Sequence, residues 1–314
     1  MRLGADHVLV RVPATSANLG PGFDAMGLAL GLHDEIEVQL VASDDVRVEV
    51  VGEGAGEVPD GAEHLVVRAL QHTLEAAGAP LTGVHLRCTN RIPHGRGLGS
   101  SAAAVVSGIV AARGLLADPH ALDARAMLSI ATAFEGHPDN AAPALQGGAT
   151  LAWSGADGPR AVSLEVDPRI RATVLVPEAR LATSRARGVL PQQVPHADAA
   201  FTAGRAALLV EALARRPELL LDATEDRLHQ DYRAEVMAST TELVRALRAE
   251  GLAATVSGAG PTVLVLATAE QEPALDALLG ELLGGGRDGA TDGGWKVGRP
   301  AIDATGATCR SVGP

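Results

Sequence analysis

Residues 93–103 read Pro93-His94-Gly95-Arg96-Gly97-Leu98-Gly99-Ser100-Ser101-Ala102-Ala103. Three glycines within five positions allow the backbone to turn tightly and to approach a ligand within hydrogen-bonding distance. The Ala- and Val-rich run that follows predicts a helix over about residues 101–117. The first N–H groups of such a helix have no intrahelical partner and lie at the positive end of its dipole. The segment therefore predicts an anion site built from peptide groups.

Lysine is almost absent from the chain, and this excludes two common phosphate sites. Lys296 is the single lysine, so 25 of the 26 basic residues are arginines. A Walker A loop requires Gly-Lys-Ser/Thr, and a protein kinase requires a strand lysine at the phosphates. Any phosphate must therefore be held by N–H groups, a metal or arginine. Ser100 or Ser101 either caps the helix or presents a hydroxyl to a Mg²⁺ that bridges phosphates.

The composition excludes further classes of protein. The 314 residues carry a formal net charge of −12 and only 2% aromatics, which argues against nucleic acid as a partner. Cys88 and Cys309 are expected to be unpaired thiols of a cytoplasmic protein, because no basic-then-apolar leader follows Met1. The longest apolar run, 102–117, is shorter than the roughly 20 residues of a membrane span. We expect neither nucleic acid nor a membrane as partner.

The order of the predicted elements indicates an α+β protein of two domains, 1–157 and 158–314. Residues 154–160 are the best candidate for a linker, and the glycine-rich loop at 284–294 is expected to be mobile. The expected strands are 7–12, 36–40, 46–51, 84–88, 149–153, 162–166, 172–176, 253–256 and 262–267, with edge strands at 295–297 and 301–303. The expected helices are 64–77, 101–117, 123–134, 197–214, 217–231, 235–250 and 273–283.

Two further segments offer polar groups at turns. Asn18 and Asp24 flank a Gly-Pro-Gly turn directly after a strand, and an amide with a carboxylate suits the ammonium and hydroxyl of a small amino acid. The alternative is a turn in which both side chains satisfy their own backbone. Residues 135–140, Glu-Gly-His-Pro-Asp-Asn, offer two carboxylates, an imidazole and an amide. A metal site through His137 is the weaker interpretation, because no second histidine stands at ligand spacing.

The sequence resembles the GHMP kinases, which include galacto-, homoserine, mevalonate and phosphomevalonate kinases. Three ordered stretches carry the resemblance: 13–24 (Pro-Ala-Thr-Ser-Ala-Asn-Leu-Gly-Pro-Gly-Phe-Asp), the phosphate motif at 93–103, and 257–262 (Ser-Gly-Ala-Gly-Pro-Thr). The first stretch, together with 135–140, is most similar to the homoserine kinases of that family. The resemblance implies a ribosomal protein S5 domain 2-like N-terminal domain and a ferredoxin-like C-terminal domain.

The resemblance also implies the ligands and their residues. ATP is expected on the loop residues Pro93, His94, Gly95, Arg96, Gly97, Leu98, Gly99, Ser100, Ser101 and Ala102. Mg²⁺ is expected between Ser101 and Glu135. The substrate is expected to contact Asn18, Asp24, His137, Asp139, Asn140, Thr183, Arg187, Arg233 and Gly260. Arg187 and Arg233 are the candidates for the substrate carboxylate, since a planar guanidinium binds carboxylates through two hydrogen bonds.

The activity that this resemblance implies is ATP-dependent phosphorylation of the L-homoserine hydroxyl to O-phospho-L-homoserine, in threonine biosynthesis. Either Asp139 accepts the hydroxyl proton or Asn140 orients the hydroxyl, and orientation is the preferred hypothesis because a loose phosphoryl-transfer transition state does not require a strong base. The alternatives are another small-molecule kinase of the family and a non-catalytic nucleotide-binding regulator. A homodimer is a further expectation from the family.

Overall fold

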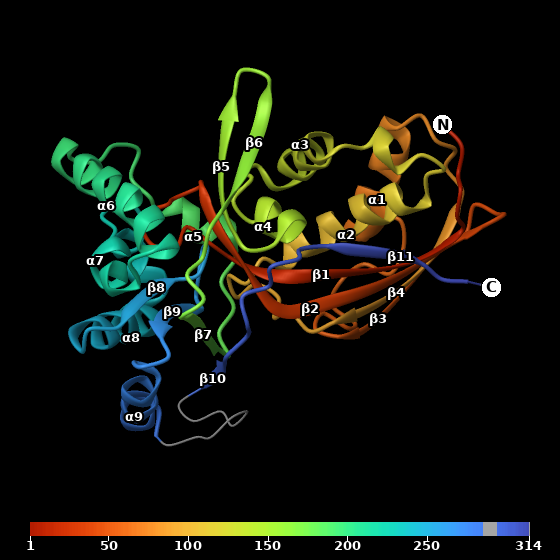
Figure 1. The fold of residues 1–314 in the computed structure, drawn as a ribbon. Helices are drawn as coiled ribbons and strands as arrows, with labels where there is room; N and C mark the ends of the chain where they lie inside the picture. Colours follow the sequence, from red (N-terminus) through yellow and green to blue (C-terminus); the bar gives the residue numbers. More distant parts are fainter. Residues whose placement is uncertain (285–293, 314) are drawn as a thin grey trace.

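The computed structural model describes residues 1–284 and 294–313, and its strands form two separate sheets (Figure 1). The larger sheet has the order β11-β1-β2-β4-β3, with β5 paired to β2 and β6 to β5. Its strands are β1 (His7–Ala17), β2 (Met26–Val41), β3 (Val46–Gly52), β4 (Gly83–Asn90), β5 (Ala149–Gly155), β6 (Gly158–Leu164) and β11 (Thr308–Ser311). All pairs are antiparallel except β3 with β4.

Helices from the first half of the chain lie together beside the larger sheet (Figure 1). They are α1 (Leu65–Ala76), α2 (Ser100–Leu115), α3 (Ala124–Glu135) and α4 (Ala141–Gln146), with a short 3₁₀ turn, Pro119–Ala121. The small residues of α2 allow close packing: a Cβ added at Gly108 would lie 2.5 Å from the carbonyl oxygen of Val66 in α1. The low bulk of α2 therefore fixes its approach to α1, and with it the position of the loop at its N-terminus.

The smaller sheet belongs to the second half and has the antiparallel order β10-β7-β9-β8. Its strands are β7 (Ile170–Pro177), β8 (Ala253–Val256), β9 (Val263–Thr268) and β10 (Trp295–Gly298). The helices of this half are α5 (Thr183–Gly188), α6 (His196–Ala214), α7 (Leu220–Ala223), α8 (Ala238–Ala249) and α9 (Glu272–Leu283), with 3₁₀ helices Pro217–Leu219 and Asp231–Val236. Strands and helices mix in each half, as the sequence predicts.

The hydrophobic core does not stop between the two halves. One cluster of buried side chains contains Val10 of β1 and Leu115 of α2 together with Leu213 of α6 and Leu264 of β9. The C-terminal segment also returns to the first half, where β11 pairs with β1. The expected boundary after residue 157 falls in the turn between β5 and β6, whereas hydrogen bonding keeps both of these strands in the larger sheet.

Several sequence expectations were wrong in detail. The proposed linker, 154–160, is the turn of the β5–β6 hairpin, in which Gly155 pairs with Gly158 around Ala156-Asp157. Gly158, which follows the two turn residues and begins β6, has a φ of 101°, a conformation that glycine adopts without strain. The expected helix 217–231 is interrupted because the Asp226 carboxylate accepts the N–H groups of residues 228–230. The expected edge strand 301–303 contributes one isolated bridge, Leu30 to Ile302.

Other differences concern segments that the sequence did not signal. The helices α4 and α5 and the strand β11 were not predicted. The glycine-rich loop expected at 284–294 lies outside the described residues except at its two ends. No helix among residues 1–284 and 294–313 has the length and apolar character needed to cross a membrane.

Candidate active site

The phosphate loop, residues 93–99, has the backbone conformation that its glycines allow. Gly95, Gly97 and Gly99 have φ values of 66°, 79° and 70°, in the left-handed region that favours glycine. Gly99 is also the N-cap of α2, and no side chain caps that helix. Because the alternation of left-handed residues turns N–H groups toward one side, the loop and the uncapped helix end together form a concave anion site.

The carbonyl groups of the loop are bonded to the elements around it. Gly95 O accepts from Leu181 N at 2.9 Å and Arg96 O from Thr262 N at 3.2 Å. Gly97 O accepts from the Ser257 hydroxyl at 2.6 Å, and Leu98 O accepts from Thr15 N at 3.1 Å. With its carbonyls held by strands and turns of both halves, the loop can present its amide groups to an anion.

Ser101 and Glu135 meet at the mouth of this loop. The Ser101 hydroxyl donates to Glu135 Oε1 at 2.6 Å, so the hydroxyl does not cap the helix. Burial raises the pKa of the Glu135 carboxyl, and the Ser101 hydrogen bond opposes that rise. A carboxylate and a hydroxyl are the oxygen donors that Mg²⁺ prefers. The pair that the resemblance implies for Mg²⁺ is therefore adjacent, and its donor set fits the ion.

A short polar chain runs from the residues after α3 to β1. His137 Nδ1 lies 2.5 Å from Asp139 Oδ1, and Asn140 Nδ2 donates to the same oxygen at 3.3 Å. The Thr15 hydroxyl in turn donates to Asn140 Oδ1 at 2.8 Å. The hydrogen bond to Asp139 raises the pKa of His137. Asp139 is buried, so this chain holds a carboxylate and an amide in fixed orientations beside the phosphate loop.

The turn after β1 carries the next two predicted residues. Asn18, Leu19 and Asp24 all have positive φ values, 70°, 48° and 55°, which non-glycine residues rarely adopt. Asn18 Oδ1 accepts from Asp24 N at 3.0 Å, and Asn18 Nδ2 donates to Gly258 O at 2.8 Å. The two terminal nitrogens of Arg187 in α5 donate to the two carboxylate oxygens of Asp24, at 3.1 and 2.6 Å. Both halves of the chain therefore contribute to this ion pair.

The ring of Phe23 is close to both predicted arginines. The guanidinium carbon of Arg187 is 5.6 Å from the Phe23 ring centroid, and that of Arg233 is 5.7 Å from it. Arg233 is buried; its Nε donates to Ala186 O at 3.2 Å and its Nη1 to Gly258 O at 3.1 Å. Burial lowers the pKa of Arg233 to about 10. Within the described residues, the hydrogen bonds of the Arg233 side chain are made by Nε and Nη1, and none is made by Nη2.

These residues surround a cavity of about 320 Å³. The predicted residues that line it are Asn18, Gly95, Gly97, Gly99, Ser100, Ser101, Glu135, His137, Asp139, Asn140, Thr183 and Arg187. Asp24 does not line the cavity, but it pairs with Arg187, which does. Arg233 and Gly260 are separated from the cavity by Gly258 and Gly97, which they contact. Pro93, Arg96 and Leu98 line a separate cavity of about 430 Å³, His94 is next to Gly54, and Ala102 is buried in α2.

Some residues of the site were not singled out from the sequence. Phe134, Leu181 and Ala259 line the cavity, and Thr15 orients Asn140. Phe134 directly precedes Glu135, so the end of the predicted helix was the available signal for it. Asp24, His137 and Asp139 also place ligand atoms within 4.8 Å of one another, a spacing that suits a metal ion. Asp24 already pairs with Arg187 and His137 with Asp139, so these groups satisfy one another.

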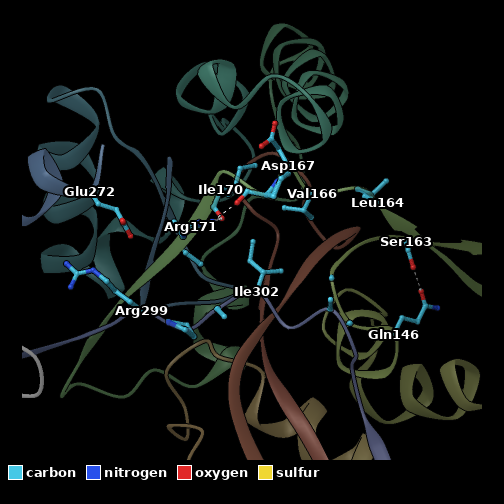
Figure 2. Close-up of a pocket in the computed structure, with 17 residues that line it drawn as sticks. Gln146, Ser163, Leu164, Val166, Asp167, Ile170, Arg171, Glu272, Arg299 and Ile302 are labelled. Carbon is cyan, nitrogen blue, oxygen red and sulfur yellow. Dashed lines mark hydrogen bonds between the residues drawn. The ribbon is translucent and has the colours of Figure 1, made fainter. Parts of the chain in front are cut away.

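A larger cavity of about 660 Å³ lies elsewhere between the two halves and shares no lining residue with the phosphate-loop cavity. Figure 2 shows side chains from both halves around it, among them Gln146, Arg171 and Ile302. Arg171 donates to the carbonyls of Pro168 and Ile170, and Arg299 pairs with Asp276. The guanidinium groups of this larger cavity are therefore already engaged with protein groups.

The two halves and the peptide-built phosphate loop together define the class of the protein, the GHMP kinases. The model of the GHMP kinases N terminal domain matches residues 64–148, which include the phosphate loop and Glu135. The model of the GHMP kinases C terminal domain matches residues 205–283, from α6 to α9. The expected two-domain α+β fold is confirmed.

Individual relatives narrow the class further. The homoserine kinase of Streptomyces coelicolor is 52% identical over 305 residues, 97% of this chain and 94% of that protein. The homoserine kinase of Clavibacter michiganensis is 57% identical over 260 residues, 83% of this chain and 82% of that protein. The crystal structure of homoserine kinase from Cytophaga hutchinsonii has a TM-score of 0.84 at 27% identity and covers 98% of both chains. The chain therefore belongs to the homoserine kinase family of the GHMP kinases.

Proposed function

We propose that the chain transfers the γ-phosphoryl group of ATP to the hydroxyl of L-homoserine, and that the product, O-phospho-L-homoserine, serves threonine biosynthesis. The observation that carries this proposal is the Asp24–Arg187 ion pair at the edge of the phosphate-loop cavity. An amino acid is a zwitterion, with one positive and one negative group close together. A carboxylate and a guanidinium held side by side are complementary to those two groups.

Binding of the substrate replaces one ion pair by two. The ammonium of homoserine binds the Asp24 carboxylate, and Asn18 supports that contact. The substrate carboxylate binds the two terminal nitrogens of Arg187 and also Nη2 of Arg233. Thr183, at the start of α5, and His137 line the same cavity and complete the pocket. The hydroxyl of the substrate then lies toward Asn140 and Asp139, between the amino-acid pocket and the phosphate loop.

The phosphates of ATP occupy the concave loop of residues 95–101, where N–H groups and the positive end of α2 balance their charge. Ser101 and Glu135 would hold Mg²⁺, which supplies charge neutralisation at the phosphates when it is bound. The side chains of Asn140 and Asp139 orient the acceptor hydroxyl for in-line attack. Positioning and charge neutralisation provide most of the rate enhancement in this type of reaction.

A coupled assay for ADP release tests the proposed activity. The purified chain is supplied with ATP and Mg²⁺ and with L-homoserine, L-serine, mevalonate or galactose in parallel. We expect turnover with homoserine at least about 100-fold faster than with the other acceptors, because a lost bidentate pair or a misplaced hydroxyl removes a few kcal/mol. Faster turnover of mevalonate or galactose would assign the chain to another kinase of the family. Nucleotide binding without ADP release from any acceptor would indicate a regulator.

The cellular setting is part of the same proposal. We expect the chain to act in the cytoplasm as a homodimer, with Mg²⁺ required for turnover. The net charge of −12 is consistent with a small-molecule enzyme rather than a nucleic-acid-binding protein. Light scattering during size-exclusion chromatography measures the oligomeric state, and the ADP-release assay without divalent cation measures the metal requirement.

A further inference from the structure

His229 lies behind the substrate pocket, in the segment between α7 and the 3₁₀ helix Asp231–Val236, and its side chain is fully buried. Nε2 of the ring is 2.7 Å from Gly20 O, in the turn after β1. Nδ1 is 3.0 Å from Nη1 of Arg233. The ring also stacks on Phe23, with 5.0 Å between ring centroids and an interplanar angle of 27°.

The two partners of His229 fix the state of its ring. A carbonyl oxygen only accepts hydrogen bonds and a guanidinium only donates them. Nε2 therefore carries the proton and Nδ1 carries the lone pair, which makes the imidazole neutral. Burial lowers the pKa of His229, although the Asp226 carboxylate, 3.6 Å from Nε2, opposes this. A second proton on Nδ1 would point at the Arg233 cation and break the contact.

His229 completes a closed circuit of hydrogen bonds between the two halves of the chain. Arg233 Nη1 donates to Gly258 O, and the same oxygen accepts from Asn18 Nδ2. Gly20 lies two residues after Asn18 in the polypeptide, and its carbonyl oxygen accepts the hydrogen bond from His229 Nε2. The turn of residues 18–24, which belongs to this circuit, holds three non-glycine residues at positive φ, a conformation that such residues rarely adopt. Such a turn persists only where its surroundings hold it.

We propose that His229, in its neutral form, is a positioning residue: it orients Arg233 toward the substrate carboxylate and holds the turn of residues 18–24 in its binding conformation. The proposal rests on the proposed function, because it assigns the carboxylate of the amino-acid substrate to Arg233. His229 does not line the cavity. Its effect therefore passes through the contacts of Arg233 and of the turn, and it acts on substrate affinity rather than on the phosphoryl-transfer step.

Three substitutions separate the effects of the two hydrogen bonds that the His229 imidazole makes. In His229→Asn, the amide oxygen stands near the position of Nδ1 and still accepts from Arg233. In His229→Gln, the amide nitrogen stands near the position of Nε2 and still donates to Gly20 O, but Arg233 loses its acceptor. His229→Phe keeps the ring stacked on Phe23 and loses both hydrogen bonds. Thermal unfolding of each variant shows that it is folded before kinetics are compared.

We expect His229→Asn to raise KM for homoserine by at most about threefold, because Arg233 keeps its acceptor and only the turn of residues 18–24 loses its hydrogen bond, the one to Gly20 O. In His229→Gln and His229→Phe, KM for homoserine should rise about tenfold, the effect of one hydrogen bond to a charged group. The KM for ATP and kcat should change by less than about threefold in all three variants. A readout without substrate is the NMR signal of the Arg233 Nε–H, whose bond to Ala186 O protects it from exchange. That protection should fall in His229→Gln and persist in His229→Asn.

The proposal is overturned if His229→Gln keeps the parent KM for homoserine and the parent exchange rate of the Arg233 Nε–H. It is also overturned if KM for ATP and KM for homoserine rise together in all variants, since that pattern indicates a general structural role. If the unsubstituted chain does not phosphorylate homoserine, the proposed function fails by itself. The NMR comparison then still decides whether His229 orients Arg233.

Discussion

Asp139 has a buried carboxylate, and two neighbouring side chains contact the same oxygen of it. Oδ1 is in contact with His137 Nδ1 and accepts a hydrogen bond from Asn140 Nδ2. A general base requires a free lone pair directed at the substrate hydroxyl within hydrogen-bond reach. The two contacts at Oδ1 fix the Asp139 carboxylate and the Asn140 amide in one arrangement, and we therefore expect the pair to orient the hydroxyl.

The Asp139→Asn variant tests this interpretation. We expect kcat to fall by roughly 10- to 100-fold with KM for homoserine nearly unchanged, since a misoriented hydroxyl costs less than a missing base. The pKa of His137 should also fall, because Asp139 raises it in the parent chain. NMR titration of the His137 ring measures that change. A loss of kcat beyond roughly 10⁴-fold with unchanged KM would instead identify Asp139 as the base.

Arg187 is the second side chain whose geometry makes a sharp prediction. Its fork binds both oxygens of Asp24, and it is half-buried in the pocket. Arg187→Ala should raise KM for homoserine about 100-fold, because charged hydrogen bonds contribute roughly 1.5–3 kcal/mol. Arg187→Lys should recover only part of this loss, since an ammonium cannot bind two carboxylate oxygens in the same plane.

Initial rates at saturating ATP measure the effect of these two substitutions. Arg185→Ala is the matched control, because Arg185 is an exposed arginine of the same helix, α5. An unchanged KM in Arg187→Ala would remove Arg187 from the substrate site. An equal rise in Arg185→Ala would show that α5 itself, rather than the Arg187 side chain, had been disturbed.

The phosphate loop depends on glycine for two separable reasons. Gly95 and Gly97 share a positive φ, but a Cβ at Gly97 would lie 2.3 Å from Ser257 O, whereas the nearest atom to a Cβ at Gly95 is 3.7 Å away. Gly97→Ala should therefore lower kcat/KM for ATP by about 100-fold or more, because the loop must move away from the Ser257 turn. In Gly95→Ala the only cost is the positive φ, so kcat/KM for ATP should fall by about tenfold or less.

Steady-state kinetics with varied ATP compare these two variants, and thermal unfolding shows whether each is folded. Equal losses in Gly95→Ala and Gly97→Ala would show that backbone conformation alone sets the requirement for glycine. In that case the close approach of the Ser257–Thr262 turn to the loop would have no effect on nucleotide binding.

Asp34 in β2 holds the segment that leads into the phosphate loop. Its Oδ1 accepts from Arg91 N at 2.6 Å and from Ile92 N at 2.9 Å. Burial raises the pKa of Asp34 from 3.8 to about 6, although these hydrogen bonds oppose the rise. The folded chain therefore binds the proton more tightly than the unfolded chain. The contribution of Asp34 to stability is fully present below about pH 4 and is lost as the pH rises to about 6.

Asp34→Asn should be more stable than the parent chain above pH 6. The amide oxygen still accepts both N–H groups, and roughly 3 kcal/mol is the upper limit of the gain, at about 1.4 kcal/mol per pKa unit. The difference in stability should shrink as the pH falls from 6 to 4. Urea unfolding at several pH values measures it, with Asp44→Asn as the control because Asp44 is exposed. A difference in stability between Asp34→Asn and the parent chain that stays constant with pH would contradict the raised pKa of Asp34.

Local signals explain which elements the sequence could predict. The alternation of Val8, Val10 and Val12 and the glycines before α2 act within a few residues, and both are found in the structure. Strand β11 was missed because its partner, β1, lies about 300 residues earlier in the chain, so no local pattern reports the pairing. His229 was missed because a single buried histidine has no motif of its own. Arg233 was chosen through the family resemblance, since nothing in its neighbours distinguishes it from the other arginines.

The two halves of the molecule depend on each other for burial. Leu213, Leu220 and Leu264 of the second half are buried in the same cluster as Val10 and Ile109 of the first. The outer edge of β1 is covered by β11, and an uncovered edge strand offers unpaired backbone groups to other chains. The termini lie at the same end of the molecule (Figure 1), which places the C-terminal strand beside the strand that begins at His7.

A chain of residues 1–164 should therefore fail to fold by itself, although it contains the phosphate loop and β1 to β6. We expect no sharp urea transition, poor dispersion of its amide NMR signals and binding of a hydrophobic dye, because it exposes core residues that the second half covers. Adding residues 165–314 in trans should restore cooperative unfolding and ADP release. A matched chain that carries residues 299–314 fused ahead of residue 1 restores β11 and the segment before it, which bonds to β2 and α4. If that chain folds fully, the C-terminal segment rather than the core of the second half is the missing element; if 1–164 folds unaided, the shared core is not required.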